Sequence, residues 1–295
     1  MRITQRAVAL TSLQGLNRNL DAVGKLQQQL TSGRIINAPS DSPSGTNKAM
    51  QTRSEQSGVA QQARNISDAK GWLAQGDSTI REMLDTTGRV RDLTVQGLNS
   101  GAMSDASRQA LATEIASLRQ GLLSLANTNV QGRPFFGGPT TGAKAYNDDG
   151  TFAGVTGGPE ITRRVSESEK VRVDLTGTEA FGPAGSNLFD VVEKINISLT
   201  SDDQVGLAAG LADLDTAIKR MTTAVADIGS RAARVDRAEQ LNLDRSMNLR
   251  VKLGETENVD LPNAIMKLQM QKVGYEAALA ATAKAISPTL LEYLR

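Results

Sequence analysis

The sequence predicts a mainly α protein: a long antiparallel helical rod with paired N- and C-terminal helices and a small β-rich insert at its centre. Three observations predict this fold. Apolar residues recur in steps of three and four over most of the 295 residues. Proline is absent from 44–133 and from 184–261. All five phenylalanines and four of the eight prolines fall within 131–190, so this segment differs from its helical flanks.

The first helix is predicted from Ile3 to Leu30, and the stretch "SGRIINAPSDSPSG" (32–45) interrupts it. Pro39 lacks a backbone donor and clashes with a preceding helical turn, so it should end the first helix. Ser42 followed by Pro43 is typical of an N-cap and a first helical position, so a second helix should begin there. The residues of this joint between helices are Asn37, Pro39, Asp41, Ser42 and Pro43.

The rod is predicted from three helical segments. From Leu207 to Val235 apolar residues advance strictly by four and three, a heptad seam that needs a partner helix. Val59 to Leu98 keeps a looser form of this rhythm, and Leu111 to Leu125 keeps a strict one. We expect these segments to pack as antiparallel helices with Ala, Leu and Met between them.

The insert is predicted to hold short strands. The stretch "VRVDLTGT" (171–178) alternates apolar and polar residues, as a half-buried strand does. In "YNDDGTF" (146–152), Asp149 and Gly150 stand where a hairpin turn would place them. We therefore read 131–190 as a small strand-rich segment carried on the rod.

Each end of the chain carries an apolar stripe on one long helix. Such stripes can be buried only against each other or against other molecules. The ordinary alternative is the core of a helical bundle, but no third element is evident to cover these faces, so we favour intermolecular packing. The candidate assembly residues are Ile3, Leu10, Leu13, Leu20, Val23, Leu30, Leu261, Ile265, Leu268, Tyr275, Leu279, Ile286 and Leu290.

These patterns divide the chain into five segments. Residues 1–45 form an N-terminal coiled-coil arm and joint, 46–130 the outgoing rod, 131–190 the outer β-rich insert, 191–257 the returning rod and 258–295 the C-terminal coiled-coil arm. We expect the two arms to be mobile in a free subunit and ordered in an assembly, because a thin helix pair exposes much apolar area when it is alone.

Composition argues against several functions. The chain has 33 basic and 32 acidic residues without a basic cluster, so neither a nucleic-acid nor a membrane partner is expected. It has no His and no Cys, which removes the usual general base, the thiol nucleophile and the commonest metal ligands. We therefore predict no catalytic, cofactor-binding or metal-binding residues, and no enzyme. The N-terminus has no signal-peptide apolar run, so any export should occur without a cleaved signal.

Several motifs resemble those of the flagellin superfamily. The joint "SGRIINAPSDSPSG" is similar to the pattern Asn-x-Pro-x-Asp-Asp-Pro that this family places after its first helix, with Ser42 at the second Asp. The stretch "ETENVDLPNAIMKLQMQKVGYEAAL" resembles the family's C-terminal joint and helix. The start "MRIT", the segment "NVQGRPFFGG" and the ending "SPTLLEYLR" look more like the hook-filament junction branch of the superfamily than like flagellin itself.

The resemblance implies a structural subunit of the bacterial flagellum that forms the junction ring between hook and filament. Its implied partners are other copies of itself, the hook-side junction protein, flagellin and an export chaperone. The implied location is extracellular, after export through the flagellar type III apparatus without signal cleavage. A flagellin filament subunit is the nearest alternative, and a cytosolic helical adaptor protein is the alternative from another class.

Overall fold

The structure is a computed structural model that describes residues 2–99, 104–130, 132–140 and 142–286. The chain divides into two compact units. The arm unit consists of residues 1–58 and 245–295, and the rod unit consists of residues 59–244. The five predicted segments divide the chain in sequence order. The two units instead group residues that contact one another, so each unit can join segments that are distant in sequence.

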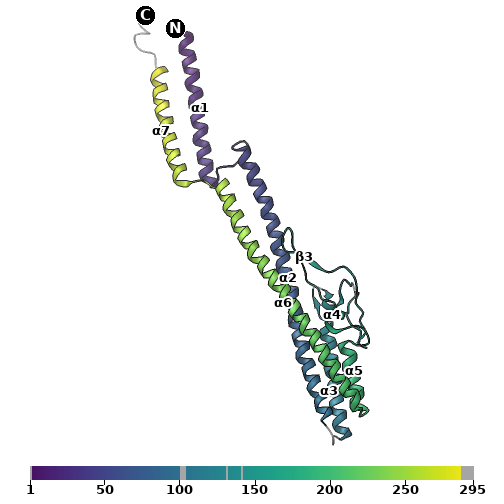
Figure 1. Cartoon of the computed structure of the whole chain (residues 1–295). Helices are drawn as coiled ribbons and strands as arrows, with labels where there is room; N and C mark the ends of the chain where they lie inside the picture. Colours follow the sequence, from purple (N-terminus) through teal and green to yellow (C-terminus); the bar gives the residue numbers. More distant parts are fainter. Residues whose placement is uncertain (1, 100–103, 131, 141, 287–295) are drawn as a thin grey trace. The chain divides into compact units, whose positions relative to one another are not determined.

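The arm unit is built on two terminal helices that pack along each other, α1 (Arg2–Ser32) and α7 (Leu261–Ile286) (Figure 1). Helix α1 ends at Ser32, seven residues before Pro39, because Gly33 adopts φ +70. This left-handed conformation closes a helix and is most favourable for glycine, which has no Cβ. The prediction that Pro39 ends the first helix was therefore wrong: Gly33 ends it.

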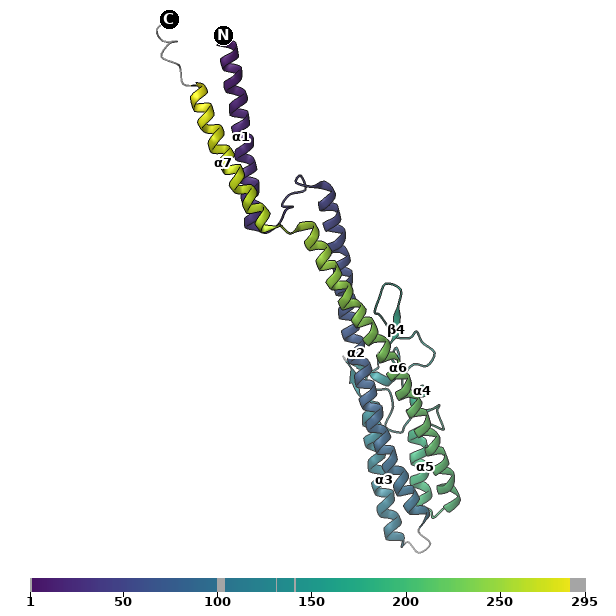
Figure 2. The ribbon, with the colours of Figure 1, turned by 60° about the vertical axis from the view of Figure 1, so that its left-hand side comes forward.

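The rod unit contains most of two long helices, α2 (Pro43–Leu98) and α6 (Gln204–Glu257), together with α3 (Asp105–Ala126) and α5 (Leu188–Thr200). Lys70 of α2 pairs with Glu239 at 2.7 Å, and Arg91 of α2 pairs with Asp215 at 2.7 Å. Partner numbers fall along α6 as they rise along α2, so the two helices are antiparallel, and both views show them side by side (Figure 2). The predicted antiparallel helical rod is confirmed.

The central segment forms two small antiparallel sheets. Strand β1 (Asn129–Val130) pairs with β2 (Arg133–Pro134), and β3 (Thr162–Arg164) pairs with β4 (Lys170–Arg172). The turn at Asp149 and Gly150 forms as predicted, with an isolated bridge between Tyr146 and Phe152 on either side of it. The predicted strand over 171–178 is shorter than expected. A capping box of Thr176 and Glu179 begins α4 (Gly177–Phe181) within it.

Aromatic side chains from the central segment form part of the rod unit's core. A one-turn 3-10 helix (Phe135–Gly137) brings Phe135 to a ring-centroid distance of 5.9 Å from Trp72 of α2. The fully buried Tyr146, Phe181 and Phe189 stack at 4.7 to 6.0 Å in the same hydrophobic cluster, which also contains leucines of α2, α3 and α6. The insert therefore supplies the aromatic part of the core that holds the rod helices together.

Candidate assembly surface

The pairing of α1 with α7 follows a heptad. The side chains with reduced exposure recur in steps of four and three on both helices, as in an antiparallel coiled coil. On α1 they include Ser12, Leu16, Asn19, Val23, Leu26 and Leu30, and on α7 Ala264, Leu268, Gln271, Tyr275, Ala278 and Thr282. Asn19 and Gln271 meet across the two helices, where Gln271 Nε2 donates to Asn19 Oδ1 at 3.1 Å. We call this side of the pair the seam.

The structure divides the predicted assembly residues into two groups. Four of them, Val23, Leu30, Leu268 and Tyr275, are buried or half-buried on the seam. The others whose side chains are described remain exposed on the flanks of the helices, with Leu10 at 55% and Leu279 at 49%. The exposed group is Leu10, Leu13, Leu20, Leu261, Ile265 and Leu279. Ile3 and Ile286 lie in the helices without a described side chain, and Leu290 lies outside the described residues.

A third set of apolar side chains was missed by the sequence reasoning. Met266, Met270 and Val273 of α7 are also largely exposed. Their spacing of four and three places them together on one face, and at 100° per residue this face lies opposite the seam. The signal was present in "AIMKLQMQKV", where apolar residues occur all around the helix instead of on one stripe. Helix α7 thus has apolar faces both toward α1 and away from it.

The joint is closed by the carboxylate of Asp41. Asp41 Oδ2 accepts hydrogen bonds from the backbone N–H of Ala38 at 2.9 Å and of Asn37 at 3.1 Å. These two bonds favour the charged carboxylate and hold the pKa of Asp41 below its ordinary value. The loop around Pro39 is therefore folded around a negative charge, which holds it in one conformation.

Helix α2 begins after the joint as predicted. The Ser42 hydroxyl accepts a hydrogen bond from the backbone N–H of Gly45 at 3.1 Å, and Pro43 is the first helical residue. A Cβ at Gly45 would lie 2.6 Å from Cδ1 of Ile36 and 2.8 Å from Oγ of Ser42, so a larger residue there would displace both side chains. The capping role predicted for Ser42 is confirmed in its geometry.

Backbone hydrogen bonds connect the N-terminal joint to the C-terminal one. The N–H of Ile35 donates to the carbonyl of Glu257 at 2.7 Å, and the N–H of Val259 donates to the carbonyl of Gly33 at 3.0 Å. The side chain of Glu257 is buried and lies 2.8 Å from Nη2 of Arg53 on α2. The two connections of the arm unit, from α1 to α2 and from α6 to α7, are therefore bonded to each other where α1 ends and α7 begins.

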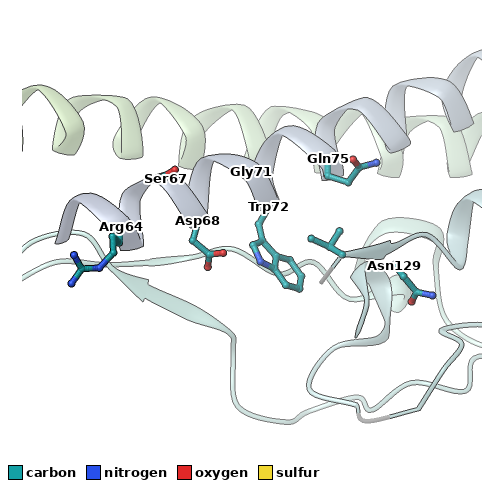
Figure 3. Close-up of a pocket in the computed structure, with 8 residues that line it drawn as sticks. Arg64, Ser67, Asp68, Gly71, Trp72, Gln75 and Asn129 are labelled. Atoms are coloured by element: carbon teal, nitrogen blue, oxygen red, sulfur yellow. The ribbon is translucent and has the colours of Figure 1, made fainter. Parts of the chain in front are cut away.

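Among the described residues, a cavity with a volume of about 600 Å³ lies along α2. Arg64, Asp68 and Trp72 project toward it from one side of the helix (Figure 3). Asp68 pairs with Arg163 of β3 at 2.5 Å, so its carboxylate serves to attach the insert to the rod. The only hydroxyl on the lining, that of Ser67, points away from Asp68, so the two do not form a nucleophile and base.

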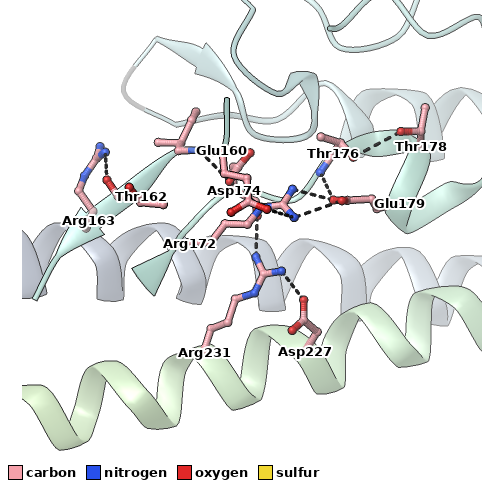
Figure 4. A network of polar contacts seen from close by, with 11 residues as sticks. Glu160, Thr162, Arg163, Arg172, Asp174, Thr176, Thr178, Glu179, Asp227 and Arg231 are labelled. Carbon is pink, nitrogen blue, oxygen red and sulfur yellow. Dashed lines mark hydrogen bonds and ion pairs between the residues drawn. The ribbon is translucent and has the colours of Figure 1, made fainter. Parts of the chain in front are cut away.

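A second polar cluster attaches the insert to α6 (Figure 4). Arg172 forms a two-pronged contact with Glu179 at 2.8 and 3.1 Å, and its Nε donates to Asp174 at 3.0 Å. Burial opposes the charge of Arg172, but the hydrogen bonds to Glu179 and Asp174 outweigh it and keep its pKa above the ordinary value. Arg231 of α6 donates to the carbonyl of Asp174 at 2.8 Å, so this network is structural.

Within the part of the chain that the structure describes, no group of three or more acidic side chains is placed to hold a metal ion. No helix in those same residues is long and apolar enough to cross a membrane.

The chain thus has a helical rod unit with its own aromatic core, and a pair of terminal helices on which apolar side chains remain exposed. Residues 3–141 match the family described as the bacterial flagellin N-terminal helical region. Flagellar hook-associated protein 3 of Salmonella typhimurium is 23% identical, and the match covers 94% of this chain and 95% of that protein. Flagellin of Bacillus subtilis is also 23% identical, with 97% and 96% covered.

Solved structures share the fold. FlgL of Bacillus cereus superposes with a TM-score of 0.61 at 22% identity, over 69% of this chain and 99% of that one. The flagellar junction protein FlgL of Legionella pneumophila superposes with a TM-score of 0.58 at 15% identity, over 71% and 99%. These structures confirm the flagellin-like helical fold. The resemblance to the flagellin superfamily is confirmed by the family match and the sequence relatives.

Proposed function

We propose that the chain is a structural subunit of the bacterial flagellum that forms the junction ring between hook and filament. The observation that carries this proposal is the match to flagellar hook-associated protein 3, which runs over nearly the whole of both chains in Salmonella typhimurium and in Escherichia coli. The uncovered apolar faces of α1 and α7 support it, because a ring of copies would bury them.

Assembly in this proposal is carried by the arm unit. The exposed apolar residues of α1 and α7 pack against neighbouring subunits, while the seam keeps the two helices of one subunit together. The joint, fixed by Asp41 and by the backbone bonds at Glu257, sets where the arm helices depart from α2 and α6. The rod unit already has a complete core, so its folding does not depend on the neighbours.

The specific partners belong to the proposal as well. They are other copies of this chain, the hook-side junction protein on one side and flagellin on the other, with an export chaperone before assembly. The subunit acts outside the cell, in the flagellum, after export without signal cleavage. The exposed apolar faces of α1 and α7 offer an export chaperone a surface to bind.

Isolated hooks that carry the hook-side junction protein provide the test. The purified chain is expected to bind to hook ends, to saturate at a limited amount per hook, and to support the addition of flagellin afterwards. Growth of long filaments from the chain alone would favour a flagellin subunit, a second candidate that the full-length match to Bacillus subtilis flagellin supports. Failure both to bind hook ends and to grow filaments would overturn both candidates.

A matched pair of variants tests the role of the arm faces. Leu10→Asp places a charge on the exposed apolar flank of α1. Thr11→Asp places the same charge on an exposed polar position that lies 100° around the helix from Leu10, on the side away from Leu13 and Leu20. Burying an unpaired charge is costly, so Leu10→Asp should reduce binding to hook ends roughly a hundredfold or more. Thr11→Asp should bind nearly as the unmodified chain does. Equal loss in both variants would contradict the assigned face.

A further inference from the structure

The outward face of α7 contains two exposed methionines. Met266 is 56% exposed and Met270 is 65% exposed. They are four residues apart, so their thioethers lie one turn apart on the same side of the helix. Both point away from the seam, which contains Leu268 and Gln271.

The surroundings of these methionines are apolar. At 100° per residue, the side chains that continue their strip toward the C-terminus are Val273, Ala277 and Ala280, and no charged residue lies on the strip between Met266 and Ala280. A strip of this kind is suited to packing against another apolar surface, and the flexible, polarizable methionine side chain adapts to an irregular one.

The methionines of the rod unit that the structure describes stand in contrast. Met83 and Met221 are fully buried in the hydrophobic core. The other exposed methionines with described positions, Met50 and Met247, lie in the arm unit but on α2 and α6, away from α7. Oxidants in solution can therefore reach the thioethers of the arm unit and not those of the rod core.

We propose that Met266 and Met270 form a modification site, at which reversible oxidation to methionine sulfoxide by a peroxide blocks assembly of the free chain. The inference rests on the proposed function. In the reaction the thioether sulfur attacks one oxygen of hydrogen peroxide. The S–O bond forms as the O–O bond breaks, the sulfur loses two electrons, and the peroxide is reduced to water. A methionine sulfoxide reductase restores the thioether.

Oxidation changes the property that assembly uses. The sulfoxide is polar, so two of them on one apolar strip must be desolvated without partners when the strip packs against a neighbour. Once the face is packed, the same thioethers are protected. The site therefore makes chains that have not yet assembled sensitive to a peroxide, while chains already in the structure are not.

Peptide mass mapping of the free chain treated with hydrogen peroxide is the first measurement. We expect Met266 and Met270 to gain one oxygen each while Met83 and Met221 remain unmodified until the chain is unfolded. Binding to isolated hook ends is then measured before and after treatment for three chains, each compared with its own untreated sample. They are the unmodified chain, the double variant Met266→Leu/Met270→Leu, and the control Met50→Leu/Met247→Leu, since leucine has nearly the volume of methionine and no sulfur.

The unmodified chain and the control should each lose roughly tenfold or more of their binding after treatment, because both keep the α7 methionines. The Met266→Leu/Met270→Leu chain should keep its binding within about twofold. An equal loss in that variant, or normal binding by a chain with sulfoxides at both positions, would overturn the inference. Failure of the proposed function would appear differently, as absence of binding by the untreated unmodified chain, and it would remove this inference as well.

Discussion

The arm unit and the rod unit differ in how many of their apolar side chains they bury. In the rod unit the buried apolar side chains form one cluster with a stacked aromatic centre. Among the side chains of the arm unit that the structure describes, four apolar ones are buried, Val23, Ala49, Leu249 and Ala264, whereas leucines and methionines of α1 and α7 remain exposed. The rod unit therefore has a complete core of its own. The arm unit leaves apolar side chains exposed, and in our proposal neighbouring subunits cover them.

This difference gives the two units different tasks in one chain. A unit with its own core folds in the free subunit and presents a defined body, and a unit with an open apolar surface gains most of its stability when neighbours cover it. The boundary between them in sequence lies near Gly58 and Arg245. Backbone hydrogen bonds join the connection after α1, at Gly33 to Ile35, to the connection before α7, at Glu257 to Val259. Helices α1 and α7 are therefore held together at this end.

The largest effect is expected from a pair of variants that each shorten one side chain to alanine, one in the rod unit and one in the arm unit. Phe181→Ala removes a fully buried ring from the aromatic core and should lower the free energy of unfolding of the rod unit by about 3 to 5 kcal/mol. Leu279→Ala removes an exposed side chain of α7 and should change that of the arm unit by less than about 0.5 kcal/mol. Urea unfolding followed by the fluorescence of Trp72, the single tryptophan, measures the effect of Phe181→Ala on the rod unit. Circular dichroism of the helices, followed in the same titration, measures the effect of Leu279→Ala on the arm unit.

The contrast between the two units would be wrong if both variants lowered the free energy of unfolding by the same amount. A large loss for Leu279→Ala would mean that its side chain is covered in the free chain, and the exposed face of α7 would no longer be available to neighbours. A small loss for Phe181→Ala would mean that the insert does not hold the rod helices together.

The next effect concerns the free subunit as a whole. Amide hydrogen exchange of the soluble chain should show α1 and α7 opening at a free energy roughly 2 kcal/mol or more below that of α3 and α5, because local stability follows the buried contacts of each element. Mass spectrometry of peptides from 2–32, 105–126, 188–200 and 261–286 resolves the two units. Equal protection throughout would favour the self-contained helical adaptor over an assembly subunit.

Local signals in the sequence were sufficient for much of the fold. The cap at Ser42 and Pro43, the turn at Gly150 and the heptad from Leu207 to Val235 all depend on residues a few positions apart, so the sequence predicts each of them. The flagellin-like helical architecture followed from them. Two local predictions differ from the structure because another signal nearby decided the outcome. Gly33 ends α1 before Pro39 is reached, and the capping box at Thr176 shortens the expected strand.

The candidate surface was only partly predictable, for a different reason. Periodicity finds the apolar residues of α1 and α7, but it does not say which of them face the partner helix and which stay uncovered. That division depends on how α1 and α7 pack, which sets Val23 on the seam and leaves Leu20 outside. Contacts such as Arg53 with Glu257 join residues about two hundred positions apart, and nothing in either local sequence identifies the other.

The smallest effect we predict is at the joint, and it depends on pH. The pKa of Asp41 lies below its ordinary value of 3.8, because the backbone N–H groups of Ala38 and Asn37 bind the charged carboxylate. A group whose pKa is lowered by folding stabilises the fold above its unfolded pKa and loses that contribution as the pH falls through the folded one. The joint should therefore be fully ordered at neutral pH and should loosen only under acidic conditions below about pH 3.8.

Amide NMR resonances of Asn37 and Ala38 report this titration directly. In the unmodified chain they should shift together with a midpoint below pH 3.8, since both N–H groups donate to the same carboxylate. In Asp41→Asn the pH dependence should disappear, and the two resonances should lie near the acidic limit of the unmodified chain at every pH. Because Asp41 is fully exposed, the global free energy of unfolding should hardly change, so the effect stays within the joint. A midpoint at or above 3.8 would mean that the carboxylate does not close the loop, and the arm helices would then leave α2 and α6 through a flexible connection.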